Sequence, residues 1–179
     1  MARDYEIEVS WRGFELHPET PPGGIQVSRY FGAGRSEAMH AHMREFAAGF
    51  GVEIHLRDHM PNTRAALACS EYARDQGRLD AFRAAVMGAH WAEGRDIEDP
   101  AVLAECAESA GLDPEATVAA RDTQGYLDRI ARVRVEAFGQ GVTGIPAFFF
   151  GRIPVLGCQR YEVLQRAAER AGARRRAGQ

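Results

Sequence analysis

The stretch "GVTGIPAFFF" at residues 141–150 constrains the fold of this chain more than any other segment. Gly141 and Gly144 bracket a turn, and Pro146 stands directly before the apolar run 147–150. A short, continuous apolar run is typical of a strand that is covered on both faces. Because proline has no backbone N–H to donate to a sheet, its place at the entrance of this run predicts a specialised turn.

A hairpin and a helix are predicted to follow this turn. Gly151 and Arg152 can reverse the chain into a second strand at 153–156. Pro154 in that strand favours an edge position, where a missing N–H costs no ladder bond. A final amphipathic helix is predicted over about 160–171.

The N-terminal part predicts a strand, a loop and a helix. Residues 6–12 alternate between apolar and polar side chains, which indicates an edge strand with one solvent-exposed face. Residues 35–50 show helical spacing of apolar residues, and the short alternation at 52–56 fits a further strand.

The middle of the chain is predicted to be a block of helices. Asn62 is a plausible N-cap for a helix that runs to about Gln76. Asp99-Pro100 and Asp113-Pro114 each pair a capping residue with a proline at the first helical position, which predicts two more helix starts. Further apolar stripes at helical spacing are formed by Leu79, Phe82, Val86 and Ala89, and by Tyr126, Ile130, Val133 and Ala137.

Charge and composition exclude several functional classes. The net charge of −3 argues against a nucleic-acid binder. All 22 basic residues are arginine, so Schiff-base lysine chemistry is excluded. The chain starts without a signal-peptide pattern and has no apolar run of membrane-spanning length, so we expect a cytoplasmic protein that does not bind membranes.

The cysteines and histidines show no metal or disulfide pattern. Cys69, Cys106 and Cys158 are odd in number and far apart, with neither a CxxC motif nor metal-ligand spacing. Cys69 and Cys106 lie on apolar helix faces and are expected in the core. Cys158 follows Gly157 just before the last helix, where backbone amides can favour a thiolate, so it is a weak redox candidate. The sequence predicts no metal site.

Four segments together resemble a known family: "WRGFELHPETPPGG", "MPNTRAALACSEYARDQGRLDAF", "EGRDIEDPAVLAECAESAGLD" and "GVTGIPAFFFGRIPVLGCQRYEVLQRA". They are similar to the DsbA-like family of thioredoxin-fold proteins, specifically its FrnE-type branch. Kappa-class glutathione transferases and hydroxychromene-carboxylate isomerase are related to that family. The resemblance implies an α/β, thioredoxin-like fold with a helical insertion at 62–138. The segments 1–61 and 139–179 would form the thioredoxin-like domain.

The chain departs from the family pattern at its start. The family begins with a strand and a CxxC motif, whereas the segment at 6–12 resembles the second strand of that pattern. The absent first strand would lie between the strands at 6–12 and 147–150. We therefore expect either a truncated chain, or another segment or another chain in that place, with 52–56 as the internal candidate.

The resemblance also implies a substrate groove. In the family, the turn before the apolar strand carries a cis proline, which implies a groove formed by Gly144, Ile145 and Pro146. There an extended substrate pairs with the backbone before the proline. Asn62 belongs to a segment that approaches this site in the family, and it can serve as a helix cap, as a substrate contact, or as both.

Three functional interpretations follow. The first is a thiol–disulfide oxidoreductase relative that is inactive as given because the CxxC is absent. The second is a non-catalytic module that binds peptides or a partner. The third is a relative of the glutathione-dependent isomerases.

The expected partners are proteins with thiols or disulfides or a small-molecule thiol, and a homodimer is compatible with the sequence. No cofactor is expected, with glutathione left open.

Overall fold

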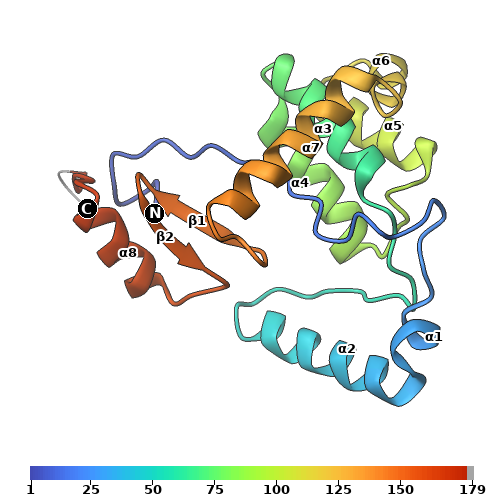
Figure 1. Cartoon of the computed structure of the whole chain (residues 1–179), viewed down its shortest axis with the longest axis horizontal. Helices are drawn as coiled ribbons and strands as arrows, with labels where there is room; N and C mark the ends of the chain where they lie inside the picture. The colour runs from blue at the N-terminus through green and yellow to red at the C-terminus, as the bar shows by residue number, and fades with distance from the viewer. Residues whose placement is uncertain (177–179) are drawn as a thin grey trace. The chain divides into compact units, whose positions relative to one another are not determined.

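The computed structural model describes residues 1–176, which form two compact units (Figure 1). One unit joins Met1–Leu16 to Val133–Gln179 and is called the hairpin unit below. The other comprises His17–Arg132 and is called the helical unit. These units differ from the segments 1–61, 62–138 and 139–179, and that threefold division stays a prediction.

Four helices build the core of the helical unit: α3 (Arg64–Asp75), α4 (Leu79–Met87), α5 (Pro100–Ser109) and α6 (Pro114–Ala120). A π-helical turn, η1 (Gly88–Ala92), continues α4. Phe82 of α4 and Leu103 of α5 are completely shielded from solvent, and Cys69 of α3 packs in the same cluster. The burial of Phe82, Val86 and Ala89 confirms the apolar stripe that the sequence predicts over 79–89.

The two Asp-Pro pairs begin α5 and α6 as predicted. The Asp99 carboxylate accepts a hydrogen bond from Ala101 N at 2.8 Å, and Asp113 accepts one from Ala116 N at 2.8 Å. Each aspartate satisfies an N–H that has no partner within its helix, and the following proline has no N–H to satisfy.

Two further helices, α1 (Val27–Phe31) and α2 (Ala33–Ala48), precede this core. The predicted apolar face of α2 includes Met39 and Phe46, and both side chains are exposed. The suggested strand at 52–56 is wrong, because these residues adopt no regular structure. The isolated pairing of His55 N with Trp91 O at 2.6 Å joins them to η1 instead of to another strand.

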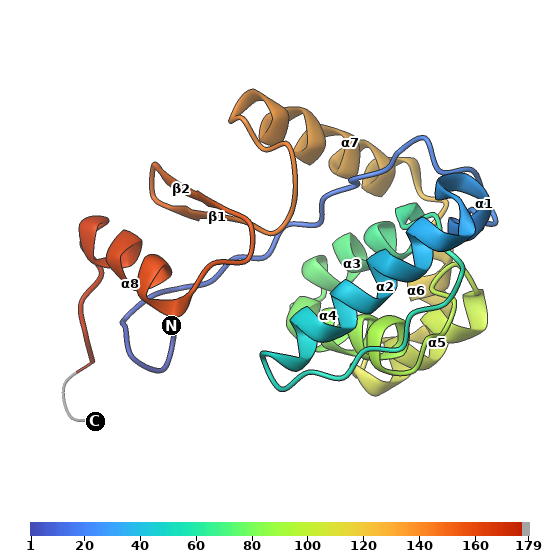
Figure 2. The ribbon, with the colours of Figure 1, turned by 90° about the horizontal axis from the view of Figure 1, so that it is seen from below.

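The hairpin unit contains the end of α7 (Gln124–Gly139), strands β1 (Ala147–Phe150) and β2 (Ile153–Leu156), and helix α8 (Tyr161–Arg170). The strands are antiparallel and α8 packs beside β2 (Figures 1 and 2). This hairpin, its two-residue turn and the final helix confirm the order predicted for the C-terminal segment. The expectation that β1 is covered on both faces is wrong, since Phe149 is 42% exposed.

The predicted strand at 6–12 is also wrong. Within residues 1–176 no strand pairs with residues 7–12, and the side chains of Val9 and Trp11 are exposed. A strand requires a partner for its backbone groups, so alternation alone does not create one. Residues 4–6 instead pair with the C-terminal segment around Arg175, where Glu6 N donates to Arg174 O at 2.8 Å and Arg176 N donates to Asp4 O at 2.9 Å.

Within residues 1–176, none of the helices combines the length and the apolar character that a membrane span requires.

Candidate functional site

The turn before β1 places Pro146 at the entrance of the hairpin. Val142 N–H donates to Ala137 O at 3.0 Å and closes the end of α7. Val142 is buried, whereas Ile145 is 52% exposed. The Ile145–Pro146 peptide bond is cis. The turn therefore has a buried anchor behind it and an exposed side chain directly before the proline.

Backbone hydrogen bonds determine which edge of β1 is open. Gly157 N–H donates to Pro146 O at 2.8 Å, one residue outside the two strands. In an antiparallel pair, bonded and non-bonded residue pairs alternate, so Ala147 and Phe149 occupy non-bonded positions. Their N–H and C=O groups point away from β2. In residues 1–176 the sheet has two strands, and no further strand occupies that edge.

Pro154 makes the two edges of the hairpin unequal. It lies opposite Phe149 in the register, at a non-bonded position, so its missing N–H costs no bond to β1. The missing donor is on the outer edge of β2, which weakens that edge for pairing with an added strand. The edge of β1 keeps its donors and acceptors and is the better template for an extended segment.

The free edge of β1 extends the site that the sequence analysis identified. The sequence points to Gly144, Ile145 and Pro146 but misses the backbone of Ala147 and Phe149. A proline inside a hairpin strand indicates a position that is not hydrogen-bonded to the partner strand. Pro154 therefore indicates which residues of β1 bond to β2 and which do not, and it is the sequence signal that could have identified Ala147 and Phe149.

Cys158 lies beside the same turn. It follows Gly157, whose N–H bonds to the Pro146 carbonyl, and its side chain is exposed as a free thiol. Cys158, the weak redox candidate, therefore lies in the same unit as the turn at Pro146 and directly follows the residue that bonds to Pro146.

The other two cysteines are buried free thiols, as expected from their helix faces. Cys69 Sγ donates to Thr117 O at 3.1 Å inside the core. Burial raises the pKa of Cys69 to about 12 and also raises the pKa of Cys106. Because the thiolate is the reactive form, neither residue is suited to disulfide exchange.

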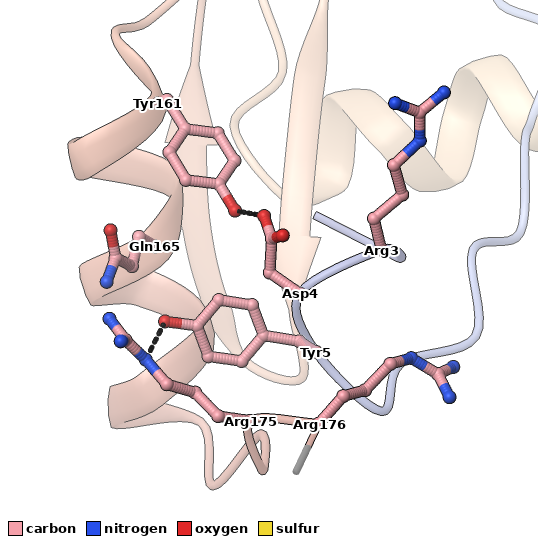
Figure 3. Close-up of a pocket in the computed structure, with 7 residues that line it drawn as sticks. All are labelled: Arg3, Asp4, Tyr5, Tyr161, Gln165, Arg175 and Arg176. Atoms are coloured by element: carbon pink, nitrogen blue, oxygen red, sulfur yellow. Dashed lines mark hydrogen bonds between the residues drawn. The ribbon is translucent and has the colours of Figure 1, made fainter. Parts of the chain in front are cut away.

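A hollow of about 250 Å³ lies where the two ends of the chain meet (Figure 3). Tyr5 is almost fully buried here, and its hydroxyl donates to Glu169 Oε1 at 2.5 Å and accepts from Arg175 Nε at 3.1 Å. The hydroxyl of Tyr161 donates to Asp4. The hollow is lined by Arg3, Asp4, Tyr5, Tyr161, Gln165, Arg175 and Arg176.

Two hydrogen-bonded groups lie at this hollow: Tyr5 with Glu169 and Arg175, and Tyr161 with Asp4. The hydrogen bond to Asp4 raises the pKa of Tyr161 to about 12, and the Tyr5 hydroxyl lowers the pKa of Glu169. In Figure 3, the Arg3 side chain points away from Tyr5 and Tyr161. We interpret these hydrogen bonds as a connection between the two ends of the chain that holds α8 and the hairpin in place.

Asn62 lies in the helical unit, one residue before Thr63, which occupies the N-cap position of α3. Its Oδ1 accepts from Arg64 N at 2.9 Å, its Nδ2 donates to Thr20 O at 2.6 Å, and its backbone N–H donates to Glu98 at 2.6 Å. The predicted N-cap is therefore displaced by one residue, although the Asn62 side chain still accepts from the first N–H of α3. A role for Asn62 in substrate binding stays a prediction, since Pro146 belongs to the other unit.

Comparison with known families supports a thioredoxin-like fold. The DSBA-like thioredoxin domain matches residues 1–169. A crystal structure of a probable DsbA oxidoreductase from Streptomyces coelicolor superposes with a TM-score of 0.78 at 27% identity, covering 90% of this chain and 74% of that chain. A structure of 2-hydroxychromene-2-carboxylate isomerase superposes with a TM-score of 0.67 at 20% identity, covering 77% of this chain and 68% of that chain.

Two curated proteins are similar in sequence. The 2-hydroxychromene-2-carboxylate isomerase of Sphingobium xenophagum is 31% identical over 160 residues, which span 83% of this chain and 76% of that protein. The uncharacterized protein YwbO of Bacillus subtilis is 25% identical over 165 residues, which span 90% of this chain and 81% of that protein.

Proposed function

This chain belongs to the DSBA-like thioredoxin domain family, and from that membership we propose that it binds extended segments of thiol- or disulfide-containing proteins along the free edge of β1. The observation that carries the proposal is the open backbone of Ala147 and Phe149 beside Pro146. Main-chain pairing with such an edge provides affinity, and alternate side chains provide selectivity.

Exposed apolar side chains flank this edge. Ile145 lies directly before Pro146 and Phe149 lies within β1, and both are about half exposed. An added strand would place its backbone against β1 and bring its own apolar side chains near Phe149. This arrangement favours unfolded or extended protein segments over small polar ligands.

The same proposal assigns little dithiol chemistry to these 179 residues. Disulfide exchange requires a thiolate and a resolving thiol near it. Cys69 and Cys106 are buried and have raised pKa values. Cys158 is far from both of them in the sequence. We therefore infer that the chain binds its partner without reducing it, in a cytoplasmic setting that keeps Cys158 as a free thiol.

Binding can be tested with reduced, alkylated insulin B chain carrying a fluorescent label. The substitution Phe149→Pro removes an N–H from the free edge of β1 but no bond to β2. The affinity for the labelled B chain should therefore fall at least about tenfold. Phe149→Ala is the matched control, because it removes the ring but keeps the N–H, and it should lose much less affinity. Circular dichroism and urea unfolding would verify that both variants fold.

Equal affinity of the Phe149→Pro variant and the wild type would contradict binding at this edge. Insulin reduction provides a separate test of the chemistry. We expect the chain to reduce insulin disulfides no faster than a free thiol does, and a clearly faster rate would contradict the non-reducing role.

A relative of the glutathione-dependent isomerases is the second candidate. The supporting observation is the 31% identity to a protein named 2-hydroxychromene-2-carboxylate isomerase. Calorimetric titration with glutathione tests it directly, followed by an assay of 2-hydroxychromene-2-carboxylate isomerisation if binding is found. Absence of measurable glutathione binding at millimolar concentration would remove this candidate.

A further inference from the structure

Three metal-ligating side chains that are distant in sequence meet within the helical unit. His59 follows the loop at 51–58, and Asp96 and Glu98 lie in the loop between η1 and α5. One ligand atom from each residue lies within 4.8 Å of the others. All three side chains are partly buried.

The backbone holds His59 at this place. The next residue, Met60, exchanges two backbone hydrogen bonds with Ile25, each 2.9 Å long. Gly24 packs against the imidazole so closely that a Cβ there would lie 2.5 Å from His59 Cε1. The position and orientation of the ring are therefore set by the chain around it.

The two carboxylates are also oriented by backbone amides. Glu98 accepts from Gly23 N at 2.8 Å and from Asn62 N at 2.6 Å, through different oxygens. Asp96 Oδ1 accepts from Glu98 N at 2.9 Å. Outer hydrogen bonds of this kind orient metal ligands, and each carboxylate oxygen keeps a second lone pair for a cation.

The remaining lone pairs lack protein donors. His59 Nε2 is shielded from solvent and has no hydrogen-bond partner in residues 1–176. It lies 3.6 Å from Asp96 Oδ2, which is too far for a hydrogen bond. Two ligands bound to one Zn²⁺ at about 2.0–2.1 Å in tetrahedral geometry lie about 3.3–3.4 Å apart, so the His59–Asp96 pair at 3.6 Å is close to the required separation. The three ligand atoms lie within 4.8 Å of one another, so the most distant pair would approach by up to about 1.4 Å when the ion binds.

We propose that His59, Asp96 and Glu98 bind a divalent transition-metal ion, with Zn²⁺ as the best match. One imidazole and two carboxylates suit Zn²⁺ better than Mg²⁺ or Ca²⁺, which favour oxygen ligands alone. The ion would connect the loop at Gly23, the start of α3 and the loop before α5. This site departs from the sequence expectation of no metal, which rested on spacing along the chain.

Zn²⁺ titration of the full chain by calorimetry tests the site, in a Cys158→Ser background that removes the exposed thiol as a competing ligand. One Zn²⁺ should bind per chain and should not be displaced by excess Mg²⁺. His59→Ala and Asp96→Asn should each weaken the affinity at least about tenfold, because each removes one of three ligands. His42→Ala is the matched control, since this exposed histidine lies on α2, and its affinity should be unchanged.

X-ray absorption of the Zn²⁺-loaded protein gives a readout that does not depend on the variants. It should show imidazole nitrogen and oxygen ligands without sulfur. The proposal is overturned if Zn²⁺ shows no saturable binding, if both ligand variants bind like the parent, or if the absorption data show sulfur ligands.

Discussion

Cys69 shows how the core changes the chemistry of a single residue. It lies on the inner face of α3 and donates to the carbonyl of Thr117. Burial raises its pKa from 9.0 to about 12, because the apolar surroundings disfavour the thiolate. Cys158, by contrast, is exposed beside the proline turn.

The raised pKa of Cys69 predicts a loss of stability in alkaline solution. Below about pH 9 the thiol is protonated in both states, and above it the unfolded chain loses the proton first. The free energy of unfolding should therefore fall as the pH rises towards 12, by at most about 1.4 kcal/mol per pH unit for this thiol.

Urea unfolding at about pH 8 and about pH 10 checks this linkage. Cys69→Ala should lose less stability between these pH values than the wild type does. Cys158→Ala serves as the control and should lose as much as the wild type. An equal loss in all three proteins would show that Cys69 is not responsible.

At the scale of elements, the helix starts depend on local capping. Asp99 and Asp113 each accept a backbone N–H in the first turn of their helix. Asp99→Ala should lower the free energy of unfolding by about 1 kcal/mol, because it leaves that N–H without its side-chain partner. Glu108→Ala, on the exposed side of α5, should change it by no more than about 0.5 kcal/mol. Chemical denaturation measures both, and equal effects would argue against the cap.

Helix α2 differs from the core helices in its surroundings. Phe46 is about half exposed, and Ser36 is the buried residue of this helix. Few buried apolar contacts allow local opening at low free energy. Hydrogen exchange should therefore be faster in α2 than in α5, as measured by mass spectrometry on the intact chain. Equal protection of the two helices would mean that the apolar face of α2 is covered in solution.

At the scale of the whole molecule, the two units have separate cores. Tyr5 is buried in the hairpin unit and Phe82 in the helical unit. Tyr5→Ala and Phe82→Ala should each cost about 3–5 kcal/mol in their own unit. Each substitution should lower the unfolding temperature of one unit much more than that of the other.

Calorimetry with hydrogen exchange can separate these transitions. Exchange in β1 and α8 should increase in Tyr5→Ala, and exchange in α3–α6 should increase in Phe82→Ala. A single transition that shifts equally in both variants would show that the units unfold as one.

The clearest gap between sequence and structure concerns strands. Residues 6–12 and 52–56 alternate in the sequence, yet neither segment is a strand. Alternation records which side chains tolerate water, whereas a strand also requires a neighbouring backbone. The hairpin was predictable because its partner strands are joined by a two-residue turn.

The sequence by itself determined the local features: the Asp-Pro helix starts, the start of α3 to within one residue of Asn62, the hairpin after Pro146 and the family resemblance. The first three depend on residues close together in the chain, and the resemblance depends on four such segments in their order along it. Only the tertiary structure decided that Tyr5 meets Glu169, that the edge of β1 is open, and that His59 lies beside Asp96. The contacts of Tyr5 and His59 join distant segments through packing and hydrogen bonding, and no spacing along the chain encodes them. The edge of β1 is open because no other strand of residues 1–176 pairs with it.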